Sequence, residues 1–431
     1  MTKRINLLII LSIIIFSRNA KAVTQFTNAM ISENTTWSGE IIVLGTVTVG
    51  KNASLTILPG TVIRFIPPDG NLNVKGTLLA GGTYEQRITF TLYDENNPLE
   101  KWEGVIFSEG VEKDTTSSLS NCLIKFANTG IKCSEKTILS IENCSFIKNN
   151  LGINILLSSD VTVSHSEFIE NINGAVACEQ SNVKILNSYF NNNNDFAITC
   201  TKKSEGVIEE NLIIKHRYGI IFAFVETKGI IKNNIIQENE FGIFVERLPE
   251  LMVSNNTLRN NDYGIYLERG PKPGITMNEI TENRIGIFIR QNSGLNVNDN
   301  NIYNNREYEI GLKEVSSDII RKMKQIVKDK KDTKDVFPCM KDGLDIPDDV
   351  LTDYIDAQRN FWGEEMTKEM ELKGDKANIT KILDFYDNSE ALGKDGNMYK
   401  EKYIFYGEWK KTAIEGAGAG KKPSYGLIIT K

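Results

Sequence analysis

A short phrase returns along this chain at a fixed interval. Residues 261–266 read NDYGIY and residues 283–288 read NRIGIF, so Gly264 and Gly286 lie 22 residues apart. Steps of 22 or 23 residues in both directions reach nine equivalent anchor positions: Gly130, Gly152, Gly174, Phe196, Gly219, Gly242, Gly264, Gly286 and Tyr308. A repeat of this length stacks one small structural unit on the next. This repeat therefore constrains the fold more than any other feature of the chain.

Other positions repeat at the same phase. Three residues before the anchor, Asn fills seven of nine places: Ala127, Asn149, Asn171, Asn193, His216, Asn239, Asn261, Asn283 and Asn305. Eight residues before it stands a second polar row: Cys122, Cys144, Ser166, Ser188, Asn211, Asn234, Asn256, Asn278 and Asn300. The positions six and eleven residues before the anchor are apolar in every repeat. Short alternating segments with Asn and Gly at the bends predict an all-β coil of three strands per repeat.

Each coil should pair with the next about 4.8 Å along the axis. The aliphatic rows would then fill a continuous core, and Gly and Asn would occupy corners with unusual backbone angles. The Asn side chains should bond from coil to coil. We expect Asn239→Ala to cost roughly 1 to 3 kcal/mol because it leaves buried partners unsatisfied.

Segments at both ends of the repeats carry a family resemblance. The stretch TWSGEIIVLGTVTVGKNASLTILPGTVIRF (36–65), then GTLLAGGTYEQRITFT and KWEGVIF, resembles the N-terminal coils of right-handed parallel β-helix proteins of the pectate-lyase-like superfamily. IDAQRNFWG (355–363) resembles their closing Asn-aromatic-Trp-Gly coil. Within that superfamily the likeness is greatest to exported NosD-like or generic β-helix-repeat proteins. The resemblance implies a single-stranded right-handed parallel β-helix with about 22 residues per coil.

The chain start is typical of an export signal. Lys3 and Arg4 precede an apolar run from Ile5 to Phe16, and Ala20-Lys21-Ala22 suits a signal peptidase. The run of 12 is shorter than the ~20 residues that span a bilayer. We therefore expect a periplasmic or cell-surface protein without a transmembrane anchor after cleavage. Removing residues 1–22 leaves 46 basic and 56 acidic residues, a net charge of −10, which disfavours nucleic acid as a partner.

The expected organisation follows the repeats: a signal peptide (1–22), an N-terminal cap with the first coils (23–116), regular repeats (117–317), a Lys/Asp-rich helical insertion (318–350), a closing coil with the C-terminal cap (351–409) and a loosely held Gly-rich tail (410–431).

Catalytic motifs of the superfamily are missing. There is no Gly-His-Gly segment with clustered Asp, no Asp-Pro-His segment, and no match to the Asp-rich calcium site and catalytic Arg of pectate lyases. The chain has two His: His216 most simply replaces an Asn in its row, and His165 is a nonspecific acid/base candidate beside Glu167. We assign no catalytic residue. A divergent polysaccharide lyase or glycoside hydrolase remains the alternative to a noncatalytic protein.

Metal and cofactor signals are weak. NosD-like proteins are associated with copper-site assembly, yet two His without a Met/His cluster disfavour copper here. No dinucleotide or phosphate-binding motif is present. We expect no cofactor, and we expect folding to survive a chelator because the apolar rows supply the core.

The strand after each anchor suggests a ligand surface. Alternation places Phe244, Tyr266 and Phe288 outward on consecutive coils. Two residues later the predicted outward row runs Cys178, Cys200, Ala223, Glu246, Glu268 and Arg290. Aromatic rings bordered by charges suit a polysaccharide or another envelope component. Two alternatives stay open: the rings pack beneath the 318–350 insertion, or the protein is a structural or adhesive spacer.

The same outward row makes Cys178 and Cys200 a candidate disulfide on adjacent coils. Two unlinked thiols are the competing interpretation, because a parallel stack need not provide the required torsion.

Overall fold

The computed structural model describes residues 23–97, 99–108, 116–247, 249–269, 271, 273–290, 295–313, 354–384, 387 and 403–420. It contains two units, residues 1–161 with 169–172 and residues 162–168 with 173–431. The predicted signal peptide and the 318–350 insertion lie outside the described residues.

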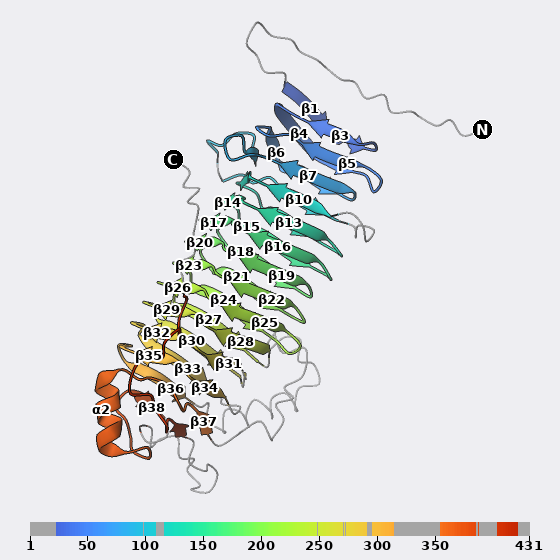
Figure 1. The fold of residues 1–431 in the computed structure, drawn as a ribbon. Coiled ribbons are helices and arrows are strands. Elements are labelled where there is room, and N and C mark those ends of the chain that lie inside the picture. Colours follow the sequence, from blue (N-terminus) through green and yellow to red (C-terminus); the bar gives the residue numbers. More distant parts are fainter. Residues whose placement is uncertain are drawn as a thin grey trace, which may run out of the picture. The chain divides into compact units, whose positions relative to one another are not determined.

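The first unit consists of parallel strands, each paired with the equivalent strand one coil away (Figure 1). In one sheet, β1 and β2 pair with β4, and the following coils continue through β6, β8, β9, β11, β12, β14 and β15. These strands are β1 (Val23–Thr27), β2 (Met30–Ile31), β4 (Glu40–Val49), β6 (Val62–Val74), β8 (Ile88–Leu92), β9 (Gly104–Phe107), β11 (Cys122–Lys125), β12 (Thr129–Cys133), β14 (Ser145–Ile147) and β15 (Leu151–Leu156).

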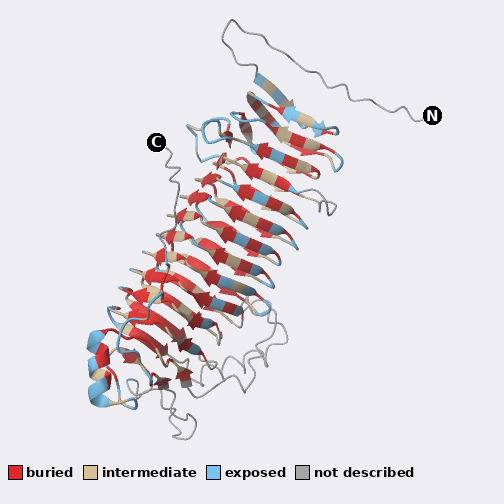
Figure 2. Ribbon diagram, in the orientation of Figure 1, coloured by how far each residue is buried: buried red, intermediate tan, exposed pale blue. Residues whose placement is uncertain are grey.

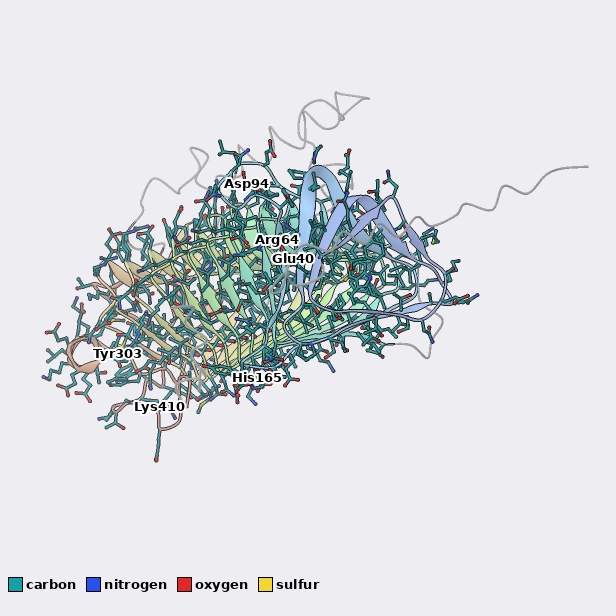
Figure 3. All side chains as sticks on the ribbon, turned by 90° about the horizontal axis from the view of Figure 1, so that it is seen from above. Glu40, Arg64, Asp94, His165, Tyr303 and Lys410 are labelled. Atoms are coloured by element: carbon teal, nitrogen blue, oxygen red, sulfur yellow. The ribbon has the colours of Figure 1, made fainter. Side chains whose placement is uncertain are left out.

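The other sheet of this unit contains β3 (Thr35–Trp37), β5 (Ser54–Ile57), β7 (Thr77–Gly81), β10 (Ser117–Ser120) and β13 (Ile138–Glu142), paired in that order. The first coils predicted from residues 36–65 are therefore present. Surface ion pairs join neighbouring coils, as between Arg64 Nε and Glu40 Oε1 at 2.9 Å (Figure 3). In sequence, β16 (Asp160–Ser164) and β17 (Glu167–Ile169) follow.

The second unit repeats a three-strand coil along three parallel series. The first series is β18 (Gly174–Glu179), β21 (Phe196–Thr201), β24 (Tyr218–Ala223), β27 (Phe241–Glu246), β30 (Tyr263–Glu268), β33 (Ile285–Arg290), β36 (Tyr308–Lys313) and β38 (Ile382–Leu383). The second is β20 (Tyr189–Asn191), β23 (Leu212–Ile214), β26 (Ile235–Gln237), β29 (Thr257–Arg259), β32 (Glu279–Thr281) and β35 (Asn301–Tyr303). The third is β19 (Asn182–Leu186), β22 (Glu205–Glu209), β25 (Lys228–Lys232), β28 (Glu250–Ser254), β31 (Gly274–Thr276), β34 (Asn296–Asn298), β37 (Tyr354–Asp356) and β39 (Tyr403–Phe405).

Both predicted apolar rows are buried in every repeat. Figure 2 shows buried residues running along the strands of each unit. Six residues before the anchor these are Ile124, Phe146, Phe168, Phe190, Ile213, Ile236, Leu258, Ile280 and Ile302; eleven before it they are Leu119, Ile141, Val163, Ile185, Ile208, Ile231, Val253, Ile275 and Val297. Within each unit these buried rows form the core of the coils, and apolar burial grows with each added repeat.

The two polar rows form hydrogen-bonded ladders, as predicted. In the second unit one ladder runs from Asn193 through His216 to Asn305, and each side-chain oxygen from Asn239 to Asn305 accepts the backbone N–H of the rung before. The other continues from Asn300 to Asn360, whose Oδ1 accepts the Asn300 N–H at 2.8 Å. Asn360 lies in the predicted closing coil, 60 residues after Asn300. The closing coil therefore continues this ladder, although Asn360 lies far from Asn300 in the sequence.

The anchor glycines serve a different purpose from the one predicted. A Cβ on Gly242 would lie 2.5 Å from the Gly264 carbonyl oxygen, so glycine is needed for close approach of neighbouring coils. The left-handed corner angles fall instead on the residue just before each ladder Asn, such as Glu238 with φ 59°. The residue before each ladder Asn therefore adopts the left-handed backbone angle, and the anchor Gly allows neighbouring coils to pack closely.

The C-terminal segment departs from the expected loose tail. Helix α2 (Glu364–Lys373) buries Met366 and Met370. Residues 411–420 then run along the coils of the second unit: Ile414 N donates to Asn301 Oδ1 at 2.7 Å, Gly418 N to Met277 O at 2.9 Å, and Ala419 N to Thr257 Oγ1 at 3.0 Å. Glycine and alanine leave room for the backbone to reach these partners. Residues 421–431 lie outside the described residues.

Candidate functional site

The predicted aromatic row exists on the outer side of β27, β30 and β33. Phe244, Tyr266 and Phe288 are direct register partners on consecutive coils. A second row, which we did not predict, lies beside it: Tyr218, Phe241 and Tyr263 are register partners on β24, β27 and β30. We call these six residues the aromatic surface.

The second row was missed because strand alternation breaks at the anchor. Gly242 and Ile243 are both buried, so Phe241 and Phe244 on either side both face outward. Strict alternation would have turned Phe241 inward with Ile243. The available signal was the aromatic residue directly before the anchors Gly219, Gly242 and Gly264.

The rings pack against one another along each row. Centroids lie 5.0 Å apart for Tyr218 and Phe241, 5.2 Å for Phe241 and Tyr263, and 5.4 Å for Phe244 and Tyr266, with planes within 11° of parallel. The two rows meet edge to face, as Phe241 does with Tyr266 at 5.2 Å and 85°. Near-parallel rings at these separations are stacked with an offset. Each ring face is therefore partly covered by the next ring, and the rest of the face and the ring edges remain for a ligand.

Burial of the surface is uneven. Phe288 is buried, with 9% of its surface exposed, which corrects the expectation of an exposed ring at this position; the other five rings are half-buried. Desolvation, with the Glu268 carboxylate next, raises the pKa of the Tyr266 hydroxyl, so this group remains a neutral donor at ordinary pH. The competing hypothesis that the 318–350 insertion covers the rings falls on residues outside those described.

Ion pairs border one side of the surface. Arg290 Nη1 contacts Glu268 Oε1 at 3.1 Å, and Arg269 bonds Glu246. The three predicted charged residues, Glu246, Glu268 and Arg290, thus form coil-to-coil pairs. A glycosidase-type use of Glu246 and Glu268 as two working carboxylates would have to break both pairs.

The opposite side is bordered by arginines that stack on the rings. Arg217 lies over Tyr218 at 5.0 Å and Arg284 lies over Tyr263 at 4.5 Å from the centroid. Arg284 also pairs with Asp262 and, at 2.8 Å, with Glu307. The result is an apolar strip between two lines of paired charges.

The two histidines have different environments. His216 is buried in the ladder: its Nδ1 lies 3.1 Å from Asn239 Oδ1, and its Nε2 lies 3.0 Å from Asn193 Nδ2. Burial lowers its pKa to about 4. This geometry confirms that His216 replaces an Asn of the row. His165 is exposed, with a left-handed φ of 48° (Figure 3).

Cys178 and Cys200 are not outward, which corrects the predicted row. Both are buried, and they align with the inward Phe222 rather than with Ala223. The corners before Gly174 and Phe196 are one residue longer, because Phe196 pairs with Tyr218 and not with the anchor Gly219. Ala197 on β21 therefore takes the position that Gly219 occupies on β24, and the two cysteines face the core.

Neither Cys178 nor Cys200 forms a disulfide in this structure. We expect them to stay unlinked in the purified protein, because in-register neighbours keep their Cβ atoms near the ~4.8 Å coil spacing while a disulfide needs about 3.8 Å. Alkylation after unfolding without reductant, followed by mass spectrometry, should label both residues. An intact peptide linking Cys178 to Cys200 would contradict this expectation.

Within the described ranges no three His, Cys, Asp or Glu side chains gather as metal ligands would. The same ranges contain no helix long and apolar enough to cross a bilayer.

Comparison with known proteins places this architecture in a class. Residues 105–225 match the family model described as right handed beta helix region. The protein is a right-handed parallel β-helix repeat protein. Within that class, residues 195–309 match the model described as periplasmic copper-binding protein (NosD). This NosD-like region contains the whole aromatic surface.

Solved structures with similar coils include the periplasmic alginate epimerase AlgG, at 14% identity and TM-score 0.44 over 85% of this chain and 76% of that one. A substituted form of the same epimerase aligns at 14% identity and TM-score 0.43 over the same shares. A search of curated protein sequences found no significant match.

Proposed function

We propose that this protein is an exported, noncatalytic β-helix module that binds an extended polysaccharide of the cell envelope along its aromatic surface. The observation that supports the proposal is the in-register repetition of outward rings on consecutive coils. A repeating surface suits a repeating ligand, because each coil offers the same contact to the next unit of a polymer. Aromatic residues with hydroxyls also combine apolar area with a polar tip.

The ring geometry defines how such a ligand would bind. Sugar units would lie across the ring edges and the hydroxyls of Tyr218, Tyr263 and Tyr266, since offset stacking partly covers the ring faces. The paired charges at the borders, such as Arg290 with Glu268, would bond sugar hydroxyls without leaving an unpaired charge. Weak contacts repeated over several coils would supply the affinity.

Export is part of the proposal. The N-terminal segment has the pattern of a signal peptide, and the NosD family is described as periplasmic. A periplasmic or cell-surface location follows, where envelope polysaccharide is available.

Copper, named in the NosD family description, is not part of the proposal. The chain has two His; one is buried in the ladder, and the described residues form no three-ligand cluster. Two His, one of them buried in the ladder, do not fit a copper site built mainly from imidazole groups.

The test compares Tyr266 variants on a glycan array and by titration with any polysaccharide hit. Tyr266→Phe keeps the ring contacts with Phe244 and Phe288 but removes the hydroxyl, so we expect weaker binding with an unchanged unfolding midpoint. Tyr266→Ala should reduce binding at least tenfold and lower stability by about 1 to 2 kcal/mol through lost ring pairs.

Met252→Ala is the matched control, because Met252 is an outward apolar residue, 52% exposed, on a different sheet. Product analysis accompanies every hit. Cleavage of the polysaccharide would favour the lyase or hydrolase alternative, and silence across the array would favour the structural or adhesive spacer.

A further inference from the structure

The first coil has open strand edges. Strands β1 and β2 pair with β4 on one side only, and β3 likewise pairs only with β5; no other described strand pairs with them. Their backbone N–H and C=O groups on the opposite side therefore have no partner strand in the part of the chain that the structure describes. Such an edge is a template for another strand.

The hydrogen bonds show which groups point outward. The Asn28 N–H donates to Leu44 O, on the β4 side. Because successive residues of a strand alternate the direction of their backbone groups, Thr24 and Phe26 also point toward β4. Val23, Gln25 and Thr27 then direct their N–H and C=O groups away from it.

The edge lacks the features that usually prevent association. Residues 23–37, VTQFTNAMISENTTW, carry one charged residue, Glu33, and no Pro, although a quarter of the whole chain is charged. Val23 and Met30 are 47% and 59% exposed beside the edge. Natural edge strands are commonly protected by Lys, Pro or a covering element.

We propose that the mature protein forms a two-fold dimer through this edge, with β1 of one copy paired antiparallel to β1 of a second copy. The outward groups are symmetric about Gln25, so Gln25 faces itself and Val23 faces Thr27 of the other copy. Symmetry gives three pairs, Val23 with Thr27, Gln25 with Gln25 and Thr27 with Val23. Each pair exchanges two hydrogen bonds, about six in all. β1 contains no charged side chain, and the two N-termini lie at opposite ends of the paired strands, so no like charges meet across the axis.

A second copy is the occupant that this symmetry favours. A two-fold contact uses the same patch on both partners and closes after two copies. Cleavage after Ala22, which the sequence predicts, would start the chain at Val23 and leave β1 free to pair.

The experiment is sedimentation velocity on the mature chain, residues 23–431, over a wide range of concentration. We expect a species of twice the monomer mass that dissociates on dilution. Gln25→Pro removes an outward N–H while leaving the β1–β4 hydrogen bonds, and it should raise the dimer dissociation constant at least tenfold. Gln25→Ala, which keeps the N–H, should still dimerise.

Gln25→Lys provides a second variant that keeps the backbone N–H, and it should also weaken the dimer because it places two like charges directly opposite each other on the axis. Circular dichroism checks that each variant unfolds at the wild-type temperature. A wild type that stays monomeric, a folded Gln25→Pro protein that still dimerises, or open-ended polymers would overturn the proposal.

Discussion

Replacing Asn239 with alanine is expected to lower the free energy of unfolding by about 3 kcal/mol, the upper part of the range for buried unsatisfied groups. Asn239 Oδ1 accepts two bonds from His216, one from its backbone N–H at 2.9 Å and one from Nδ1 at 3.1 Å. Both donors are buried, so water cannot replace the lost acceptor. The Nδ2 group also donates to Asn261 Oδ1 at 3.0 Å.

Urea unfolding followed by circular dichroism measures this change. Lys232→Ala is the control, because the Lys232 ammonium forms a long 3.9 Å surface pair with Glu209 and the loss of such a pair should change stability little. Equal midpoints for wild type and Asn239→Ala would show that the ladder does not stabilise the coils.

Acidification should destabilise the protein through His216 by about 3 kcal/mol between pH 6.5 and pH 4. The His216 pKa falls from 6.5 to about 4 on folding, mainly because burial disfavours the charged ring. Its stabilising effect is complete above pH 6.5, where the unfolded chain also holds a neutral ring, and it is lost as pH falls toward 4. Asn193 Nδ2 donates to Nε2 of the neutral His216 ring. Protonation of Nε2 would place two donors opposite each other and break this hydrogen bond.

The measurement is the difference in unfolding free energy between wild type and His216→Asn across this range. Asn is the ordinary residue of the row and does not titrate, so the variant should keep its ladder and lose this part of the pH dependence. Glu309 acts in the opposite sense, because burial raises its pKa and its contribution is lost as pH rises. It is present in both proteins and cancels in the difference; parallel pH profiles would therefore contradict the assignment.

The ladder was predictable because each buried Asn amide requires hydrogen-bond partners. A buried amide beside a left-handed corner must find partners, and the repeat places the next Asn one coil away, as between Asn239 and Asn261. The exception at His216 was predictable for the same reason. The rung at the closing coil, Asn360, could be recognised in the sequence only from the short segment IDAQRNFWG.

The candidate site was only partly predictable. The row Phe244, Tyr266 and Phe288 followed from alternation, but the orientation of the rings did not, since it depends on packing against the second row. The cysteines were misplaced because the corners before Gly174 and Phe196 contain one more residue, and a shift of one reverses every side chain in a strand.

By itself the sequence determined the period, the buried rows and the Asn ladders, because each depends on one residue type recurring at one interval. The tertiary structure decided which way the residues around each corner face, how the rings stack and where residues 411–420 lie. These depend on contacts between coils and between segments far apart in the chain, as when Ile414 meets Asn301. A local sequence pattern does not predict such contacts, because the register of a strand and the docking position of a segment depend on the residues that it packs against.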